Sequence, residues 1–548
     1  MCGDLEFGSI PRLVRTAAER YGDREAVVEG RARITYRQLG RRIERAAAAC
    51  MAAGVQAGDR VAVWAPNSLD WITAGLGAVT AGAVLVPVNT RLKGAEAAQV
   101  LARTRARLLF VTGPFLGTSY VAALRGAAGK PAGAPGAAAP CATVRARTSP
   151  LPGLPELRDV VVLADAAPAD FRTWKEFLAA GREVPAEAVR ERADAVGPAA
   201  ACDILFTSGT TGEPRGVVTT HAQTLRTFGV WGELAGLREG DRYLIVNPFS
   251  HTFGYKAGVI ASLMRGATIH PQPVFTAEAV LANVAAERIT VLPGPPTLYQ
   301  AVLDHPAREA YDLSSLRVAV TGAAVVPRRL VDRLRGELGI ATVLTAYGMS
   351  EATGVITMCR PGDSAEVVAG TSGRAIPGTE VKVTGADGRA LGVGEPGEIL
   401  VRGYQVMSGY FEDADATAQA VDADGWLHTG DVGVLDGDGN LRVTDRLKDM
   451  FVVGGFNAYP AEIEQLLARH PGVADVAVVG VPDDRLGEVG KAFAVRSGGA
   501  DAVTAEGLIA WARREMANYK VPREVEFVGT LPRNASGKVL KGVLRQRR

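Results

Sequence analysis

The sequence predicts an α/β protein with a large N-terminal domain of sheets packed with helices and a small α+β C-terminal domain. Helical and strand patterns alternate through the first 110 residues. Three short apolar strands in the middle of the chain each end in a turn of small or polar residues. The last hundred residues change to a compact mixture of strands and two helices. Such alternation is typical of sheets covered by helices.

The elements of the N-terminal part are predicted from the local periodicity of the sequence. Residues 37–53 have the pattern of an amphipathic helix, and residues 61–64 that of a short strand. Residues 71–90 carry no charge over a length that could cross a membrane, but they are rich in Ala, Gly and Thr and contain Pro87. We therefore expect a buried helix that leads into a core strand. Residues 126–155 are rich in Ala, Gly and Pro without an apolar period, which predicts a disordered surface insertion.

Three predicted strands in the middle of the chain lead into turns that could carry chemistry. Residues 203–206, 316–321 and 341–346 are followed by TSGTTG, GAA and YGMSE, respectively. In open parallel sheets, ligands bind beyond the carboxyl ends of the strands. The three turns are therefore expected to meet at one site.

The C-terminal part begins after a dense cluster of charges at residues 445–449. Helices are expected over residues 460–470, with Pro460 in the first turn, and over residues 504–519. Residues 473–481 and 491–495 are expected to be strands. We place a domain boundary at the charge cluster, with domains at residues 1–445 and 446–548.

Composition limits the partners of the protein. The 61 basic and 59 acidic residues leave a net charge of +2, which argues against nucleic acid or an anionic membrane as the main partner. Five widely spaced cysteines and the lack of an apolar leader in the first 30 residues favour a reduced, cytoplasmic protein without integral membrane association. The oligomeric state is left open, with a homodimer as one option.

Residues 207–216 form the most informative string, TSGTTGEPRG. Four hydroxyl side chains, three glycines and one arginine directly follow a predicted core strand. Glycines let backbone N–H groups approach a polyphosphate, hydroxyls add donors, and Arg215 adds a cation. The string is not a P-loop, which requires GxxxxGK followed by Ser or Thr. It predicts a phosphate-binding loop of another kind.

Five strings in a fixed order make the chain resemble the adenylate-forming enzymes of the acyl-CoA synthetase superfamily. They are TSGTTGEPRG at 207–216, YGMSE at 347–351, GWLHTGD at 425–431, DRLKDMFVVGGFNAYPAEIE at 445–464 and PRNASGK at 532–538. Within the superfamily, segments such as NPFSHTFGYKAG resemble actinobacterial fatty-acid–CoA ligases, including the type that acts on a steroid-ring propanoate. The resemblance spans nearly the whole chain and implies a large N-terminal domain with a small, mobile C-terminal lid.

The resemblance implies an ATP-dependent acyl-CoA ligase that forms AMP. A hydrophobic carboxylic acid would react with ATP to give an acyl-adenylate and pyrophosphate, and coenzyme A would then give acyl-CoA and AMP, with Mg²⁺ assisting. The acid would be a medium-chain fatty acid or a bulky alicyclic propanoate from steroid breakdown. Two alternatives on the same scaffold are a fatty acyl-AMP ligase that loads a carrier protein and a luciferase-type oxygenase. A catalytically inactive binding protein is disfavoured by the intact set of Glu351, Asp431 and Lys538.

Residue roles follow from the matching strings. The resemblance assigns catalysis to Lys538, His251 and Glu351, with Lys538 bridging the substrate carboxylate and the α-phosphate. It assigns Mg²⁺ to Glu351 and Thr207. Arg215 stands where the family usually has Lys. The residues implied in ATP binding are Thr207, Ser208, Gly209, Thr210, Thr211, Gly212, Arg215, Gly322, Ala323, Ala324, Tyr347, Gly348, Ser350, Asp431 and Arg446.

Further roles are implied for the hinge, the coenzyme A site and the acyl pocket. Lys448 stands at the family's hinge. The coenzyme A residues are Gly454, Gly455 and Phe456, and the acyl pocket residues are Phe249, Tyr255, Lys256 and Met349. His251 either lines or gates the acyl pocket or is a core histidine. Lys256 either extends to solvent or meets a polar group of an oxygenated acid, because an unpaired buried ammonium is costly.

Overall fold

The structure is a computed structural model. It describes residues 6–128, 149, 151–207, 214–322, 326–446, 449–453, 456–458, 460–483, 486–497, 503–516, 518–534 and 538–547.

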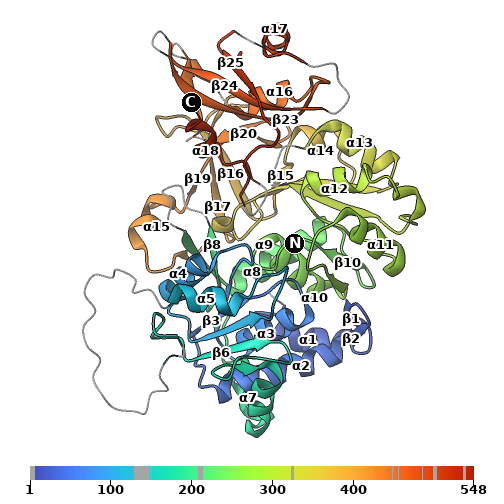
Figure 1. The fold of residues 1–548 in the computed structure, drawn as a ribbon, viewed down its shortest axis with the longest axis vertical. Coiled ribbons are helices and arrows are strands. Elements are labelled where there is room, and N and C mark those ends of the chain that lie inside the picture. Colours follow the sequence, from blue (N-terminus) through green and yellow to red (C-terminus); the bar gives the residue numbers. More distant parts are fainter. Residues whose placement is uncertain are drawn as a thin grey trace.

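An eight-stranded sheet lies in the lower part of the molecule (Figure 1). Strands β8, β4, β3, β5, β6 and β7 run parallel, whereas β9 and β18 are antiparallel to their neighbours. Strands β8 and β9 therefore form a hairpin that flanks residues 208–214 in the sequence. In sheet order the strands are β18 (Gly409–Tyr410), β9 (Arg215–Thr220), β8 (Ala201–Thr207), β4 (Val84–Pro87), β3 (Arg60–Trp64), β5 (Leu108–Thr112), β6 (Asp159–Leu163) and β7 (Arg172–Thr173).

Helices of the N-terminal part cover this sheet as the sequence predicts. Helix α2 begins after Thr35, whose side chain and that of Gln38 form a capping box. Helix α3 is almost wholly buried, and β4 follows it, which confirms the buried helix and core strand expected over residues 71–90. A Cβ on Gly77 would lie 2.4 Å from the Cβ of Ala46, so α3 and α2 touch closely. The helices are α1 (Ile10–Tyr21), α2 (Tyr36–Ala52), α3 (Leu69–Thr80), α4 (Gly94–Thr104), α5 (Tyr120–Ala128), α6 (Trp174–Ala180) and α7 (Ala186–Asp194).

Two four-stranded sheets form the next layer. One has the order β10 (Arg242–Ile245), β11 (Thr268–Pro271), β1 (Glu25–Glu29) and β2 (Ala32–Thr35). The other has the order β12 (Val318–Gly322), β13 (Thr342–Tyr347), β14 (Thr357–Met358) and β15 (Arg374–Ala375). Val291 bridges Tyr243 of the first to Val318 of the second. Their helices are α8 (His221–Leu234), α9 (Thr252–Gly254), α10 (Ala261–Arg265), α11 (Ala277–Glu287), α12 (Pro296–Leu303), α13 (Arg328–Gly336) and α14 (Ala365–Gly370).

A third four-stranded sheet, entirely antiparallel, leads toward the C-terminal part. Its order is β16 (Thr379–Thr384), β17 (Gly397–Gly403), β19 (Leu427–Leu435) and β20 (Leu441–Arg446), and α15 (Ala414–Ala420) precedes β19.

The C-terminal sheet lies at the top of the molecule in Figure 1, with α16, α17 and α18 around it. Its own core includes Phe451, Val478 and Leu508. The two helices and two strands expected in this part are confirmed. The elements are β21 (Phe451–Val453), β22 (Phe456–Ala458), α16 (Pro460–Leu467), β23 (Val473–Asp483), β24 (Gly487–Arg496), α17 (Ala505–Glu515), β25 (Glu524–Phe527) and α18 (Lys541–Arg545).

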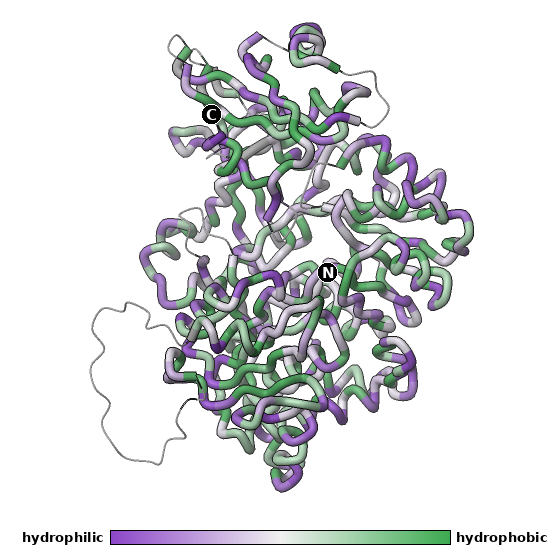
Figure 2. The backbone as a smooth tube through the Cα atoms, viewed as in Figure 1, coloured by the Kyte–Doolittle hydropathy of each residue, from purple (hydrophilic) through white to green (hydrophobic). Residues whose placement is uncertain are grey.

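Hydrophobic residues follow the strands and the buried helix faces, whereas hydrophilic residues gather on the outer helices and loops (Figure 2). None of the helices in the described ranges is long and apolar enough to cross a membrane. The described cysteines Cys50, Cys202 and Cys359 are buried free thiols.

The insertion expected over residues 126–155 is wrong at both of its ends. Residues 126–128 belong to α5, and Leu151 and Leu154 are each 3 % exposed within the second hydrophobic core. Leu151, Leu154 and Leu157 all pack into this core despite the prolines between them. Residues 129–148 and 150 lie outside the described residues.

A buried histidine gives the fold a dependence on pH. Burial lowers the pKa of His221 to about 4, and its Nδ1 accepts the backbone N–H of Ile10 at 3.2 Å. In the unfolded chain the His221 ring becomes protonated below about pH 6.5, whereas in the folded chain it stays neutral down to about pH 4. Stability is therefore lost as pH falls through this window, at about 1.4 kcal/mol per pKa unit.

We expect His221→Asn to reduce the fall of the urea midpoint between pH 6.5 and pH 4, because asparagine can accept the same N–H without titrating. The measurement is urea unfolding of both proteins at several pH values. If the urea midpoint of the variant falls with pH as steeply as that of the wild type, His221 does not titrate as described.

Candidate active site

The ends of strands from two different sheets meet at a buried carboxylate. Thr207 ends β8 of the eight-stranded sheet, and Glu351 lies in the turn after β13. The Thr207 hydroxyl donates to Glu351 Oε1 at 3.5 Å. The end of β8 and the turn after β13 thus meet, as the sequence predicts, although the strands belong to two sheets: β8 pairs with β4 and β9, whereas β12 and β13 pair with each other.

Glu351 is 8 % exposed and is held by a tyrosine that the sequence did not indicate. The Tyr410 hydroxyl donates to Glu351 Oε1 at 3.0 Å, and the Arg215 guanidinium lies 5.2 Å from the centre of the Tyr410 ring. Burial, together with the charge of Glu351, raises the pKa of Tyr410 well above its usual value. The phenol therefore stays a donor at neutral pH. Thr207, Glu351, Tyr410 and Arg215 form one connected group.

The donor set of this group suits a hard cation that also binds phosphate. No lysine or arginine in the described ranges forms an ion pair with Glu351, so its carboxylate remains available. The described residues also contain no group of three or more His, Cys, Asp or Glu side chains that could hold a metal ion by themselves. Mg²⁺ typically binds one or two carboxylates and completes its shell with substrate phosphates and water. Glu351 and the Thr207 hydroxyl fit that arrangement.

A second carboxylate comes from the third sheet. Asp431 on β19 is 4 % exposed and accepts the Tyr347 hydroxyl at 2.7 Å. Its own N–H donates to the Thr429 hydroxyl at 3.1 Å. Asp431 stands opposite Arg446 in the β19–β20 register. A buried carboxylate positioned in this way can accept a pair of sugar hydroxyls.

Glycines permit the close turns between these groups. A Cβ on Gly348 would lie 2.1 Å from the carbonyl oxygen of Gly354, and one on Gly322 would lie 2.4 Å from that of Ala346. Any other residue would push the chain apart at either place. Ser350 starts a single 3₁₀ turn that ends with Thr353 in the left-handed region. The YGMSE string therefore adopts one tight path.

The segment of residues 248–254 is anchored to the core. The Phe249 N–H donates to Asn67 Oδ1 at 2.8 Å, and the Phe249 ring lies 5.0 Å from that of Trp71. A Cβ on Gly254 would lie 2.2 Å from the carbonyl oxygen of Pro248. His251 keeps an exposed side chain whose Nδ1 accepts the N–H of Phe253 at 3.1 Å. Desolvation by the surrounding protein lowers the pKa of His251 below its usual value.

The environment of Lys256 differs from both alternatives that the sequence suggested. Its side chain is 0 % exposed, and its Nζ lies 3.0 Å from Asp203 Oδ1, so the interpretation as a surface residue is wrong. The alternative contact with a polar substrate group loses its premise, because the buried ammonium already has a carboxylate partner. Tyr255 is also 0 % exposed, with its ring 5.5 Å from that of Trp71. Met349 is partly buried against the core cluster that contains Ile399.

Lys538 belongs to the C-terminal part and lies on its surface. Its N–H donates to Asn534 Oδ1 at 2.8 Å, and the Asn534 N–H donates back to its carbonyl oxygen at 2.8 Å. An ion pair of Arg533 with Asp475 attaches this turn to β23. Of the predicted residues, Ser208, Gly209, Thr210, Thr211, Gly212, Ala323, Ala324, Lys448, Gly454 and Gly455 lie outside the described residues, as do the side chains of Arg446 and Phe456.

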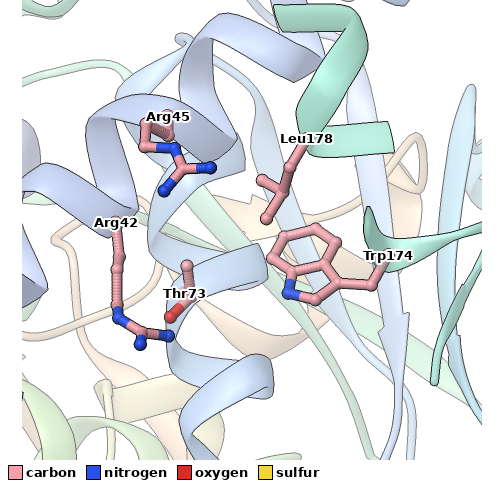
Figure 3. Close-up of a pocket in the computed structure, with 5 residues that line it drawn as sticks. All are labelled: Arg42, Arg45, Thr73, Trp174 and Leu178. Atoms are coloured by element: carbon pink, nitrogen blue, oxygen red, sulfur yellow. The ribbon is translucent and has the colours of Figure 1, made fainter. Parts of the chain in front are cut away.

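Two small hollows lie elsewhere. The one in Figure 3 has a volume of about 130 Å³ and lies between α2, α3 and α6, lined by Arg42, Arg45, Thr73, Trp174 and Leu178. The other, of about 180 Å³, borders His221 and Arg192. Neither contains a residue that the sequence assigned to catalysis.

Comparison with known proteins identifies the family. The sequence model of the AMP-binding enzymes matches residues 14–411, and that of the AMP-binding enzyme C-terminal domain matches residues 462–538. The chain belongs to the AMP-binding enzyme family. This confirms the resemblance, and the α/β fold with a large N-terminal and a small C-terminal domain matches that of solved family members.

Two relatives cover all or nearly all of the chain. A 3-[(3aS,4S,7aS)-7a-methyl-1,5-dioxo-octahydro-1H-inden-4-yl]propanoyl:CoA ligase of Rhodococcus jostii (strain RHA1) is 48% identical over 536 residues, which are 98% of both chains. A ligase of the same name from Mycobacterium tuberculosis (strain ATCC 25618 / H37Rv) is 48% identical over 546 residues, 100% of both chains. The crystal structure of an anthranilate CoA ligase in complex with anthranoyl-AMP matches with a TM-score of 0.82 and 27% identity, covering 98% of this chain and 97% of that one.

We expect Tyr410→Phe to lower the rate of ATP-dependent pyrophosphate release about tenfold, because Glu351 loses a hydrogen bond to a charged group worth roughly 1.5–3 kcal/mol. The measurement is the initial rate against ATP concentration. Tyr120→Phe is the matched control, since the Tyr120 hydroxyl donates only to the carbonyl oxygen of Thr90. Equal rates in both variants would remove Tyr410 from the site.

Proposed function

We propose that this member of the AMP-binding enzymes is an acyl-CoA ligase whose acid is a bulky, keto-bearing alicyclic propanoate. The observation that carries the choice of acid is the 48% identity, over the full length, to two ligases named for such an acid. The Lys256 side chain, buried and paired with Asp203, contributes nothing to that choice. A medium-chain fatty acid is the second candidate, since a fatty acyl CoA synthetase of Mycobacterium tuberculosis has the same fold with a TM-score of 0.73 and 30% identity.

In the first step, an oxygen of the substrate carboxylate attacks the α-phosphorus of ATP. The bond between that phosphorus and the bridging oxygen breaks, and pyrophosphate leaves with the electron pair. Two anions approach each other in this step, so cations and N–H donors must offset their repulsion. Residues 207–212, Arg215 and Lys538 supply them, and Asp431 holds the ribose hydroxyls while Tyr347 packs against the adenine.

The scheme includes a magnesium ion, and two residues of the candidate site suit its binding. Glu351 and Thr207 would hold the ion, whose charge offsets that of the phosphates. Tyr410 keeps the Glu351 carboxylate in place through its hydroxyl. We assign the segment of residues 248–254, which carries Phe249 and His251, to the acyl pocket together with Met349.

In the second step, the thiol of coenzyme A attacks the acyl carbon, loses its proton and displaces AMP. Lys538 and a thiol cannot occupy the same side of that carbon at once. We therefore assign Lys538 to the first step alone and Gly454, Gly455 and Phe456 to the second. The C-terminal domain, residues 446–548, rotates between the two about Lys448. The separate hydrophobic core of its sheet supports movement as a unit.

The reaction also points to a place in the cell. ATP, coenzyme A and reduced thiols coexist in the cytoplasm, and the three described cysteines are buried and free. We assign the protein to that compartment.

A panel of acids tests the substrate. We expect the bicyclic diketo propanoate named above to exceed octanoate in kcat/KM at least about tenfold, because a site shaped for a rigid, oxygenated ring gains little from a flexible chain. The assay follows AMP formation with coenzyme A present. A preference for octanoate would contradict the proposed acid and favour a fatty acid.

The same assay separates the rival activities. Formation of acyl-CoA at the rate of AMP release argues against a fatty acyl-AMP ligase that loads a carrier protein. Oxygen uptake or light emission with ATP and acid would instead support a luciferase-type oxygenase.

We expect Lys538→Ala to slow adenylation about 10²–10³-fold, because the incoming carboxylate loses its counter-charge. The conversion of synthetic acyl-AMP and coenzyme A to acyl-CoA should keep its rate. Each half-reaction is measured separately. Lys541→Ala is the neighbouring control, since Lys541 pairs with Glu464. Equal losses in both half-reactions of Lys538→Ala would contradict its assignment to the first step.

A further inference from the structure

A buried ion pair joins the segment that we assign to the acid to the hairpin that we assign to ATP. The side chains of Lys256 and Asp203 are both 0 % exposed, and Lys256 Nζ lies 3.0 Å from Asp203 Oδ1. We propose that Lys256 is a positioning residue that fixes where the acyl-pocket segment lies relative to the phosphate-binding hairpin. This inference rests on the proposed function.

On the ATP side, one ammonium group reaches both strands of the hairpin. Asp203 on β8 stands opposite Thr219 on β9, and β8 ends at Thr207. Lys256 Nζ donates to the Thr219 hydroxyl at 2.6 Å, and that hydroxyl donates to Asp203 Oδ1 at 2.9 Å. The Cys202 thiol donates to Asp203 Oδ2 at 3.0 Å. The three polar side chains close a ring at the base of the strands that flank residues 208–214.

On the acid side, Lys256 directly follows the segment that carries Phe249 and His251. It lies in the π-helical turn Tyr255–Ile260, a geometry found frequently at functional sites. Ile245 packs so closely that a Cβ on Gly258 would lie 2.7 Å from it. The Tyr255 hydroxyl is buried and has no hydrogen-bond partner among the described residues. The polar attachment of this turn to the hairpin therefore falls to Lys256.

The energetics favour a geometric role over a stabilising one. Taking two charges out of water costs about as much as their attraction returns, so uncharged replacements of a buried pair are often neutral in stability. Removing one partner alone is strongly destabilising, because an unpaired charge remains buried. The pair provides contacts of defined length from Lys256 to both strands of the hairpin, which a methionine at this position cannot make. Misplacement of reacting groups by 1 Å can cost a hundredfold in rate.

The test compares Lys256→Met with Lys256→Met/Asp203→Asn. The single variant should unfold at a lower urea concentration than the wild type, and the double variant should recover most of that loss. In the double variant, kcat for ATP-dependent pyrophosphate release should still fall at least about tenfold, and the KM values for ATP and for the acid should both rise. Wild-type kinetics in a double variant of restored stability would overturn the proposal.

The matched control is Arg172→Met/Asp159→Asn. It removes an ion pair of low exposure at the opposite edge of the same sheet, between β6 and β7. Its kinetics should match those of the wild type. A loss of rate and a rise of both KM values in this control equal to those of the Lys256 double variant would show a general effect of sheet stability and overturn the proposal.

Amide hydrogen exchange gives a readout that does not depend on turnover. Peptides that span residues 201–220 and 248–260 should exchange faster in the double variant, whereas those of β6 and β7 should not change. If the double variant does not fold, Thr219→Val is the deciding variant, because it keeps the ion pair and removes the β9 hydroxyl to which Lys256 donates. Its pyrophosphate release should fall at least about threefold, and a wild-type rate would overturn the proposal.

The outcomes separate this inference from the proposed function. A wild-type chain that forms no acyl-adenylate from any acid in the panel contradicts the proposed function, whatever the exchange data show. An active wild type with a double variant of equal kinetics and equal exchange contradicts the role of Lys256 alone.

Discussion

The candidate active site depends on the burial of two carboxylates, Glu351 and Asp431, whose hydrogen bonds connect three sheets. A buried carboxylate must be hydrogen-bonded or paired, since leaving it alone costs several kcal/mol. Glu351 obtains its donors from β8 and β18 of the eight-stranded sheet, and Asp431 on β19 obtains one from Tyr347 at the end of β13. Each carboxylate is thus satisfied only if two sheets keep their relative positions. The requirement to satisfy these groups ties the N-terminal architecture to the chemistry.

Close backbone contact gives the same region its rigidity. Gly348, Gly254 and Gly322 each face a carbonyl oxygen at a distance that excludes a Cβ. The end of β12, the turn after β13 and the segment of residues 248–254 are therefore packed backbone to backbone. Rigid turns suit a reaction in which two anions must be held at a defined separation. The C-terminal sheet, in contrast, encloses its own small core, which suits a part that changes position between two steps.

The buried polar groups of this protein illustrate the difference between stability and geometry. His221 contributes stability that disappears on acidification, because its neutral form alone fits the core. Lys256 and Asp203 offset each other's desolvation and contribute little net stability, and in our proposal they fix the distance between the segment assigned to the acid and the hairpin assigned to ATP. On this proposal, the value of the buried pair lies in the position it gives to two segments and not in stability.

Sequence alone determined the local elements and the family, and it predicted the site residues Thr207 and Glu351, which the structure brings into contact. The TSGTTGEPRG and YGMSE strings are contiguous, and the helices at residues 37–53 and 460–470 follow from periodicity, so each carries its signal within a few residues. The meeting of the end of β8 with the turn after β13 was predicted, but their membership of two different sheets was not, because strand order is set by pairing between distant segments. Tyr410 was missed for the same reason: it lies 59 residues from Glu351, and nothing in its local string marks it.

Tertiary structure alone decided the environment of Lys256. The sequence places it after an aromatic residue in an apolar stretch, where an ammonium is expected either to reach water or to find a polar ligand. Its partners Asp203 and Thr219 stand on two strands of a hairpin that precede it in the chain. Whether a charge is buried depends on the partner that folding brings to it, and local sequence holds no record of contacts between distant segments. The motifs therefore predicted the chemistry, whereas the relative position of the segment of residues 248–254 and the β8–β9 hairpin depends on the packing of the sheets.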